Sequence, residues 1–420
     1  NGRFNGDRAA QQDREQTIVI TVSGGKLRSS GKLLFREIRG DGIYITQKDY
    51  NTLSADPEFD LNYVYGANSA NDRRNLISVI SCAKGTIGPF VSRNVGGVVG
   101  GAQMPGGLDF EPNYSGQSAK NVSIGVVDIR GAGSSNLQFY GARWSDAAHT
   151  TPEANPSLAN VNIGVARVVN TIAANAADEF AATTQTNYAC CLIEGVVGVS
   201  IGFLDIEFTQ AYGDGLIIRN GATDITIKGR GKKIRSVLFG TGVSGADRGC
   251  KNLNIHFDMD DISRFGHAFG KVEGGRFSGR LTNPKTTYYS NRFAVHTLPP
   301  SGTGAMTNLE LAHEIPGNAN WTRSYRHTSG MTYAGSLLNG AKLPNDGAWT
   351  AEVNRIGDMP ISRQNCPQVN DMSSIPTGGT WVAGDRVRNN NSATVGTTSN
   401  WVRLTNGSAH VSGTDWKLIA

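Results

Sequence analysis

Short stretches of this chain alternate apolar and polar residues, and similar stretches return at intervals along it. The phrase reads Asn-Val-Ser-Ile in its first copy and Asp-Ile-Thr-Ile in a later one. Its copies occupy residues 121–124, 160–163, 198–201, 224–227, 252–255, 275–278 and 308–311. A period of two is typical of a β-strand with one buried face. Recurrence at gaps of roughly 23 to 39 residues predicts a solenoid built from β-coils.

The apolar positions change phase within some of these stretches. Ile201 belongs to one apolar set, and after Gly202 the set shifts by one position to include Leu204. A straight strand would then turn its side chains over, whereas a corner at Gly202 would keep both sets inside. Asn220-Gly221 marks a second corner of this kind. Strand, corner and strand around one apolar centre predict an all-β fold, a right-handed parallel β-helix. An antiparallel sandwich is the alternative, but two-residue hairpin signals are scarce.

The repeated phrase divides the chain into four expected parts. These are an N-terminal tether leading into the β-helix (1–119), the β-helix body (120–316), an irregular or β connection (317–375) and a small C-terminal β module (376–420). In the first part, residues 17–22 predict a strand. Residues 71–83 fit a short helix or another strand, because their apolar positions match neither period cleanly.

The C-terminal module differs in composition from the rest of the chain. Three of the six tryptophans, Trp381, Trp401 and Trp416, fall in the last 45 residues. Four short strands are expected here, at 380–382, 385–388, 401–404 and 416–419. The rings predict the core of a small domain or part of an oligomer contact.

Composition excludes several functional classes. The net charge of +5 is small and dispersed, so a nucleic-acid partner is not expected. No apolar window approaches about 18 residues, so no membrane span is expected. The 53 glycines and 14 prolines suit a chain that turns often while its strands stay paired. The chain begins Asn-Gly-Arg-Phe, which predicts a fragment or a processed product.

The five cysteines do not indicate a metal site. They number 82, 190, 191, 250 and 366, and no Cys-x-x-Cys occurs among them. Zinc is therefore not expected, and buried free thiols are the better interpretation. Asp258, Asp260 and Asp261 lack the spacing and the glycine of a calcium loop. We expect neither a metal nor another cofactor.

The end of the chain carries a resemblance to a known family. Gly-Thr-Trp-Val-Ala-Gly-Asp-Arg-Val at 379–387, Gly-Thr-Thr-Ser-Asn-Trp-Val at 396–402 and Gly-Thr-Asp-Trp-Lys at 413–417 resemble the C-terminal ends of bacteriophage tailspike proteins. The β-helix phrases look like the pectate-lyase-like body of the same proteins. The resemblance covers residues 120–315 and 376–420.

The resemblance implies a homotrimer of parallel β-helices on a virion, which acts at the host cell surface. Such spikes bind, and usually cleave, a capsular polysaccharide or lipopolysaccharide of the bacterial surface. Attachment to the phage tail or baseplate would use an N-terminal region missing from this chain. The family shares no single catalytic motif, so it transfers no catalytic residues.

Carboxylates on the outer face could cleave glycosidic bonds, which requires an acid and a base or nucleophile. With Leu204 and Ile206 inward, Asp205 and Glu207 point outward. The same alternation turns three residues of a later strand outward, namely His256, Asp258 and Asp260. Asp214, in a turn before the strand at 216–218, completes the expected catalytic set.

Several other side chains are candidates for binding the sugar. Aromatic rings can stack on the apolar faces of sugars, and cations or histidines can contact polar groups. The candidates are Trp144, Tyr212, Arg219, His256, Arg264, His267 and Tyr288. For the aromatic residues, packing in a loop or between subunits is the alternative, and for His267 it is a structural role.

Two other functions stay open at this stage. A polysaccharide lyase on the same fold would need a base and a cation beside a uronate, and Arg219, Lys228 and Arg264 lie in the right region. A binding spike or adhesin without turnover would carry the outward acids only as a solvated face.

Overall fold

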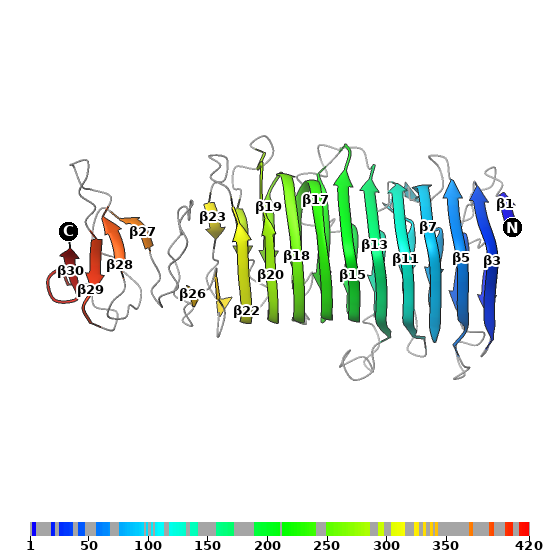
Figure 1. The fold of residues 1–420 in the computed structure, drawn as a ribbon, viewed down its shortest axis with the longest axis horizontal. Coiled ribbons are helices and arrows are strands. Elements are labelled where there is room, and N and C mark those ends of the chain that lie inside the picture. The colour runs from blue at the N-terminus through cyan, green and yellow to red at the C-terminus, as the bar shows by residue number, and fades with distance from the viewer. Residues whose placement is uncertain are drawn as a thin grey trace.

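The computed structural model consists of β-strands stacked along one long axis (Figure 1). It describes residues 2–5, 18–21, 25–36, 41–46, 56–67, 75–95, 98–99, 102–103, 106–112, 117–131, 135–141, 157–171, 189–210, 212–240, 249–285, 293–297, 304–315, 323–326, 331–332, 337–338, 341–342, 369–372, 386–389, 400–405 and 411–419. None of these residues forms a helix.

Two columns of parallel strands run along the axis. The long-strand column contains β1 (Gly2–Asn5), β3 (Lys26–Arg36), β5 (Glu58–Ala67), β7 (Lys84–Val95), β11 (Ala119–Gly131), β13 (Leu158–Asn170), β15 (Val197–Phe208), β17 (Thr223–Phe239), β18 (Cys250–Ile262), β20 (Val272–Arg280) and β22 (Gly304–Glu314). Each strand pairs in parallel with the next one named.

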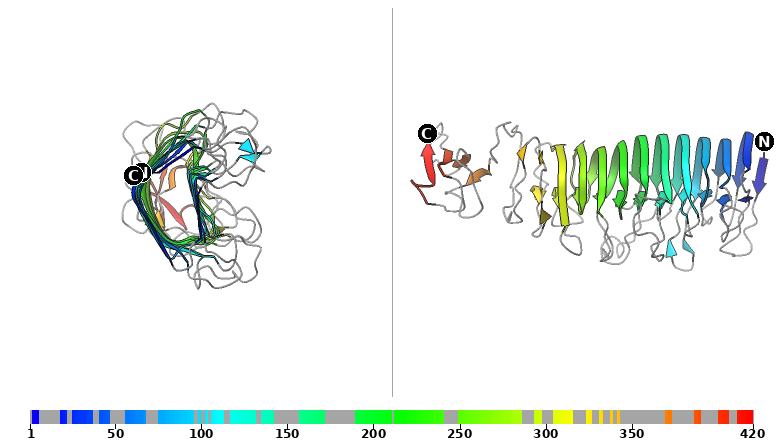
Figure 2. Two further views of the ribbon diagram at one scale, coloured as in Figure 1. Left: turned by 90° about the vertical axis from the view of Figure 1, so that its right-hand side faces the viewer. Right: turned by 90° about the horizontal axis from the view of Figure 1, so that it is seen from below.

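The short-strand column closes the other side of the coils. It contains β2 (Ile18–Thr21), β4 (Ile43–Thr46), β6 (Ile77–Val79), β10 (Leu108–Phe110), β12 (Ser135–Tyr140), β14 (Ala189–Glu194), β16 (Gly213–Arg219), the end of β17, β19 (Phe265–Phe269), β21 (Phe293–Thr297) and β23 (Arg323–Arg326). Viewed down the axis, successive coils superpose (Figure 2). The predicted parallel β-helix is confirmed.

The core is the inside of the coils, where equivalent residues of successive coils stack in rows. One row contains Val122, Val161, Val199, Ile225 and Leu253, all fully buried. Stacked strands lie about 4.8 Å apart, so each side chain contacts its equivalents above and below. The apolar positions of the sequence pattern therefore face this core, and the polar positions between them face outward.

The first residue of the repeated phrase forms a turn. Asn121, Asn160 and Asn252 adopt φ values of 56°, 57° and 52°, in the left-handed region that asparagine tolerates better than most residues. The side-chain amide of Asn160 donates to Oδ1 of Asn121 at 3.1 Å. That of Asn252 donates in the same way to Oδ1 of Asp224 at 3.0 Å. The phrase thus combines a stacked turn with the strand that follows it.

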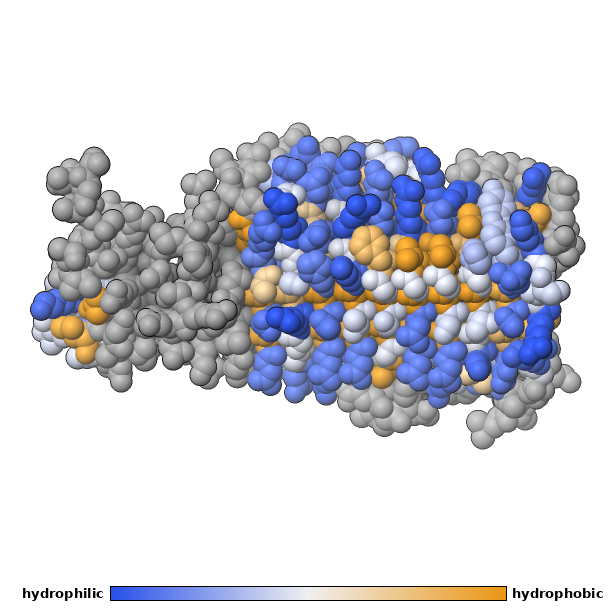
Figure 3. Space-filling model, viewed as in Figure 1, coloured by the Kyte–Doolittle hydropathy of each residue, from blue (hydrophilic) through white to orange (hydrophobic). Residues whose placement is uncertain are grey.

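The corner predicted at Gly202 is confirmed. Gly202 and Phe203 both face away from the core, and the inward alternation resumes at Leu204. In the preceding coils, Val126 and Val165 occupy the position equivalent to Phe203 and are 43% and 44% exposed. Pro89 occupies the same position one coil earlier. Figure 3 shows that hydrophobic, orange surface runs between polar rows on this face of the β-helix.

The β-helix extends further toward the N-terminus than the sequence predicted. Its coils begin at β1, which pairs with β3, rather than at residue 120. The inward positions of β3 include Ser29 and Gly31, which are too small and polar to give an apolar pattern. Within the same part, residues 17–22 and 71–83 contain the strands β2 and β6, so the strand alternative holds for the second range.

A separate four-stranded sheet lies near the C-terminus. It contains β27 (Val369–Met372), β28 (Arg386–Asn389), β29 (Asn400–Arg403) and β30 (Trp416–Ile419). Strands β28, β29 and β30 pair antiparallel, and β27 pairs with β28 in parallel. The sheet therefore begins before residue 376, and the strand expected at 380–382 lies outside the described residues.

Short strands account for the remaining described elements. They are β8 (Val98–Val99), β9 (Ala102–Gln103), β24 (Met331–Thr332), β25 (Leu337–Leu338) and β26 (Ala341–Lys342).

Candidate functional site

The outer face of the long-strand column carries a row of charges, one from each successive coil. The row reads Asp128, Arg167, Asp205, Arg230, Asp258, Arg280 and Glu314. Its sign alternates at every step. Because the strands lie about 4.8 Å apart, each charge inside the row has an opposite charge on either side. We call this series the charge row.

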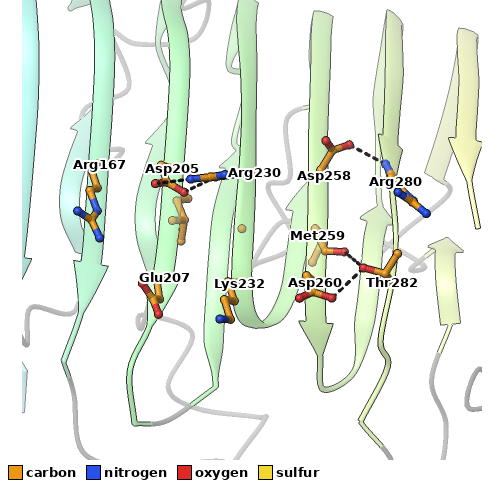
Figure 4. A pocket seen from close by; sticks show the side chains of 12 residues that line it. Arg167, Asp205, Glu207, Arg230, Lys232, Asp258, Met259, Asp260, Arg280 and Thr282 are labelled. Atoms are coloured by element: carbon orange, nitrogen blue, oxygen red, sulfur yellow. Dashed lines mark hydrogen bonds and ion pairs between the residues drawn. The ribbon is translucent and has the colours of Figure 1, made fainter.

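A second outward row lies beside it, because residues two apart on a strand share a face. It places Glu207, Lys232 and Asp260 on three successive coils, and Thr282 follows Asp260. The two rows line an open pocket of about 430 Å³ (Figure 4). Its lining includes four carboxylates and four cations, namely Asp205, Glu207, Asp258, Asp260, Arg167, Arg230, Lys232 and Arg280.

Three of the four carboxylates are held by neighbours. Asp205 accepts two hydrogen bonds from Arg230, at 2.9 Å from Nε and 3.3 Å from Nη2. Asp258 accepts from the backbone N–H of Arg280 at 2.8 Å. Asp260 accepts from the Thr282 hydroxyl at 2.8 Å and from the side-chain amide of Asn283. These contacts fix the direction in which each carboxylate points.

Three charged side chains of the pocket have no hydrogen-bond or ion-pair partner among the described residues, and we call them uncommitted. Within the described part of the chain, the side chains of Glu207, Arg167 and Lys232 have no hydrogen bond and no ion pair. Glu207 lies between Val169 and Lys232 in its row, and Arg167 lies beside Asp205 in the charge row. Figure 4 shows Arg167 and Lys232 on opposite sides of the strand that carries Glu207. These groups are available to a ligand.

Four of the five predicted catalytic residues therefore share one pocket. Asp205 and Glu207 come from β15, and Asp258 and Asp260 come from β18, two coils further along. Their catalytic role stays a prediction. Sequence reasoning missed the cations between them, although the alternation of β13 marks Arg167 as outward between Ala166 and Val168.

Asp214 does not lie in the pocket. It belongs to β16 in the short-strand column rather than to a turn, and its side chain is 4% exposed. Both carboxylate oxygens accept hydrogen bonds from Arg235, at 3.0 and 2.5 Å. All residues of β16 are buried, so the strand shows no alternation that could have revealed it. The prediction that Asp214 shares a groove with the other carboxylates is wrong.

Arg219 is likewise part of a buried ion pair. Its Nε donates to the carboxylate of Glu194 at 2.7 Å, and Asn220 binds the other oxygen of that carboxylate. The two charged side chains are 10% and 4% exposed. Arg219 therefore lies away from the pocket, on the edge of the short-strand column.

Three other candidates do not line the pocket. The Tyr212 hydroxyl donates to Asp261 at 2.7 Å. The Arg264 guanidinium lies 4.5 Å from the centre of the Phe265 ring. His256 lies beside the pocket, with Nδ1 2.9 Å from the Ser278 hydroxyl and Nε2 3.7 Å from Asp258. Trp144 and Tyr288 lie outside the described residues.

His267 lies in the core, so the prediction that it binds substrate is wrong. Its Nε2 donates to the carbonyl of Phe257 at 3.1 Å, and its Nδ1 accepts from Nε2 of His313 at 2.8 Å. Both rings are buried, and Phe239 packs against His267 edge to face. Burial lowers the pKa of His267 to about 3 and that of His313 well below its usual value.

We expect acid to destabilise the β-helix through this histidine pair. An unfolded histidine gains a proton below pH 6.5, whereas folded His267 stays neutral down to about pH 3. The free energy of unfolding should therefore fall by about 1.4 kcal/mol per pH unit for each such histidine. Thermal midpoints between pH 7 and pH 5 would show this loss, and His267→Phe should make the slope shallower. Equal slopes in the two proteins would contradict the assignment.

Neither a metal site nor a reactive thiol is evident in the described residues. No group of three histidine, cysteine or acidic side chains there could hold a metal ion. The described cysteines, Cys82, Cys190, Cys191 and Cys250, are buried and free, as predicted. Burial raises the pKa of Cys82 to about 12, so its thiol stays protonated.

Across the described residues, no helix is long and apolar enough to span a membrane. Comparisons with family models, curated proteins and solved structures found no match to this chain.

Proposed function

We propose that this protein binds a bacterial surface polysaccharide in the charged pocket and hydrolyses its glycosidic bonds. One observation carries the proposal. The stacking of coils places the uncommitted carboxylate of Glu207 and the firmly held carboxylate of Asp260 on one outward row, with Lys232 between them. Two carboxylates flanking an open pocket are the minimal equipment for cleaving a glycosidic bond.

The surroundings of the two carboxylates favour different roles. Glu207 has no ion-pair partner in the described part of the chain, which leaves it free to carry a proton to the leaving oxygen. Asp260 accepts hydrogen bonds from Thr282 and Asn283, and these donors fix the direction in which its carboxylate points. Glu207 is then the general acid, and Asp260 is the base that activates water. Asp205 orients the guanidinium of Arg230 in the charge row.

The spacing of the two groups leaves room for that water. Two steps between stacked strands separate the backbones of Glu207 and Asp260 by roughly 10 Å. Inverting glycosidases place their carboxyl groups about 6.5–9.5 Å apart, whereas retaining enzymes need about 5 Å. The register supports the inverting arrangement, in which water attacks from the side opposite the leaving group.

Digestion of purified surface polysaccharides from a panel of Gram-negative hosts tests the proposal. We expect smaller fragments with new reducing ends and no new ultraviolet absorbance. Binding without fragments from any host would instead identify an adhesin. A panel that is neither bound nor cleaved would overturn the proposal.

A lyase on the same site is the second candidate, and one observation favours it. Arg167 and Lys232, uncommitted in the described part, lie beside the carboxylates and could neutralise a uronate and remove its proton. New absorbance from an unsaturated uronate in the same digestion would identify this reaction.

We propose further that the protein is part of a phage tailspike, which is attached to the tail or baseplate of the virion and assembles as a homotrimer. The C-terminal phrases that resemble tailspikes support it. So do two exposed apolar side chains next to the C-terminal sheet, Leu404 at 44% and Val411 at 55%.

We expect the C-terminal sheet to hold the trimer together. Deleting residues 369–420 removes β27–β30 together with Leu404 and Val411, so the chain should sediment as a monomer. The double variant Leu404→Ser/Val411→Ser should weaken the trimer without removing the sheet. If both proteins remained trimeric, the contact would lie elsewhere.

A further inference from the structure

We propose that Ser278, His256 and Asp258 form a second hydrolytic site, which removes ester-linked acyl groups through an acyl-serine intermediate. The juxtaposition that carries the proposal is a histidine ring with a hydroxyl at one nitrogen and a carboxylate at the other. Nδ1 of His256 lies 2.9 Å from the Ser278 hydroxyl, and Nε2 lies 3.7 Å from Oδ1 of Asp258. This activity goes beyond cleavage of glycosidic bonds and uses neither Glu207 nor Asp260.

The register of the coils brings the three side chains together. His256 and Asp258 are two residues apart on β18, so they share its outer face. Ser278 is the residue of β20 that pairs with His256. The hydroxyl therefore approaches the imidazole across the sheet, and the carboxylate approaches it along its own strand. Because hydrogen-bonded strands carry all three groups, the arrangement is held more precisely than loops would hold it.

Asp258 favours the tautomer of His256 that the reaction needs. Its negative charge near Nε2 favours a proton on that nitrogen, which leaves Nδ1 to accept the proton of the Ser278 hydroxyl. The backbone N–H of Arg280 donates to Oδ1 of Asp258 at 2.8 Å and fixes the carboxylate (Figure 4). Compared with serine proteases the two ring nitrogens exchange roles, but each still has one partner, as proton transfer from the nucleophile requires.

The reaction balances with water as the only co-reactant. The Oγ atom of Ser278 bonds to the carbonyl carbon of the ester while its proton moves to Nδ1 of His256. The bond between that carbon and the alcohol oxygen then breaks, and the alcohol leaves with the proton from Nδ1. Water attacks the acyl-serine in the same way, so the carboxylic acid is released and Ser278 regains its proton. Asp258 stabilises the imidazolium that exists between the proton transfers.

The neighbouring residues leave room for a small ester and supply a positive charge. Ala312 of β22 pairs with Ser278, and its methyl group leaves the partly exposed hydroxyl accessible. Lys228 of β17 pairs with His256, and its ammonium has no hydrogen bond or ion pair in the described part of the chain. It is therefore available to the oxyanion that forms at the carbonyl. The described outward residues around Ser278 are small, polar or charged, so a short acyl group such as acetyl fits better than a long chain.

A polysaccharide can bring such an ester to this site. Asp258 and Arg280 line the charged pocket, and His256 lies beside it. Sugar hydroxyls can carry acyl esters, so a polymer bound across the pocket would present them next to Ser278. The polysaccharide as carrier rests on the proposed function, whereas the ester chemistry at Ser278 does not.

Two kinds of probe test the site in the full chain. A fluorophosphonate forms a covalent bond with nucleophilic serines, and we expect mass spectrometry to place it on Ser278. Hydrolysis of p-nitrophenyl acetate and release of acetate from O-acetylated surface polysaccharides measure turnover. Ser278→Ala should abolish labelling at this position and reduce both rates to background, and His256→Gln should lower them by about 10²- to 10⁴-fold.

Asp258→Asn tests the positioning role of the carboxylate. This variant should lower kcat for p-nitrophenyl acetate and leave KM unchanged, because Asp258 acts through His256 and does not contact the ester. Asparagine can still accept a hydrogen bond from the backbone of Arg280, so the thermal midpoint should not change.

Ser123→Ala provides the matched control. Ser123 is also an outward serine of the long-strand column, but it pairs with Thr86 and Asn162, and neither side chain can act as a base. This variant should carry the label on Ser278 and release acetate as the wild type does.

The outcomes separate this site from the proposed function. If Ser278→Ala kept the wild-type rate while His256→Gln lost it, the histidine would itself be the nucleophile and the acyl-serine would be wrong. If Ser278 took no label and no ester was hydrolysed above background, the whole site would be wrong. If only p-nitrophenyl acetate was hydrolysed, the polysaccharide as carrier would be wrong. Cleavage of glycosidic bonds is measured separately, as new reducing ends, so none of these results decides it.

Discussion

Glu207→Gln should lower the rate of polysaccharide cleavage by about 10²- to 10⁴-fold, the range expected for loss of a general acid or base. Glutamine keeps the size of the side chain and its hydrogen-bonding capacity but cannot transfer a proton. Because Glu207 makes no contact through its carboxylate within the described part of the chain, the fold loses nothing. The measurement is the initial rate of appearance of reducing ends, together with binding of the intact polymer.

Two further variants make this result specific. Glu273→Gln removes a carboxylate that is 62% exposed, lies outside the pocket and is 4.0 Å from Lys251. It should cleave as the wild type does. Asp260→Asn should reduce the rate as strongly as Glu207→Gln, because the base is lost instead of the acid. Unchanged turnover in Glu207→Gln would remove this residue from the mechanism.

Asp214→Ala should destabilise the protein by about 3–5 kcal/mol, the usual cost of leaving one partner of a buried ion pair alone. The Arg235 side chain is only 13% exposed and would lose the two hydrogen bonds to its carboxylate partner. The expected signs are a lower thermal midpoint and a lower yield of folded protein. Whatever protein folds should bind polysaccharide normally, because Asp214 lies outside the pocket.

An exposed ion pair supplies the comparison. Asp205→Ala breaks the contact with Arg230, whose side chain is 64% exposed, and should cost no more than about 1 kcal/mol. The double variant Asp214→Leu/Arg235→Met removes both buried charges and should recover much of the lost stability. If the Asp214→Ala variant kept the thermal midpoint of the wild type and lost only polysaccharide cleavage, Asp214 would again be a candidate catalytic residue.

Local alternation explains what the sequence could predict. In β15 and β18 one face is buried and the other is outward, so a period of two identified Glu207 and Asp260 as outward residues. The corner at Gly202 was visible for the same reason, since it shifts that period by one. These features depend only on neighbours along the chain.

What the sequence could not predict depends on contacts between coils. Arg167, Lys232 and Asp260 share a pocket because of the register between strands, which intervening loops of different lengths conceal. Strand β16 is buried on both faces, so the pattern could not distinguish Asp214 from a turn residue. In β3, small and polar inward residues hid a complete coil.

Hydrogen bonds between coils fix the spacing of the charge row, so the distance from one charged position to the next is constant along the row. Substituting a side chain changes the group at one position of the row but not the distance to the next position. Coils contact only their neighbours, so adding one between β15 and β18 would move Glu207 away from Asp260 by about 4.8 Å while the remaining coils stayed stacked. A protein of this design can therefore change the distance between two outward groups by whole coils, independently of the residues at either end.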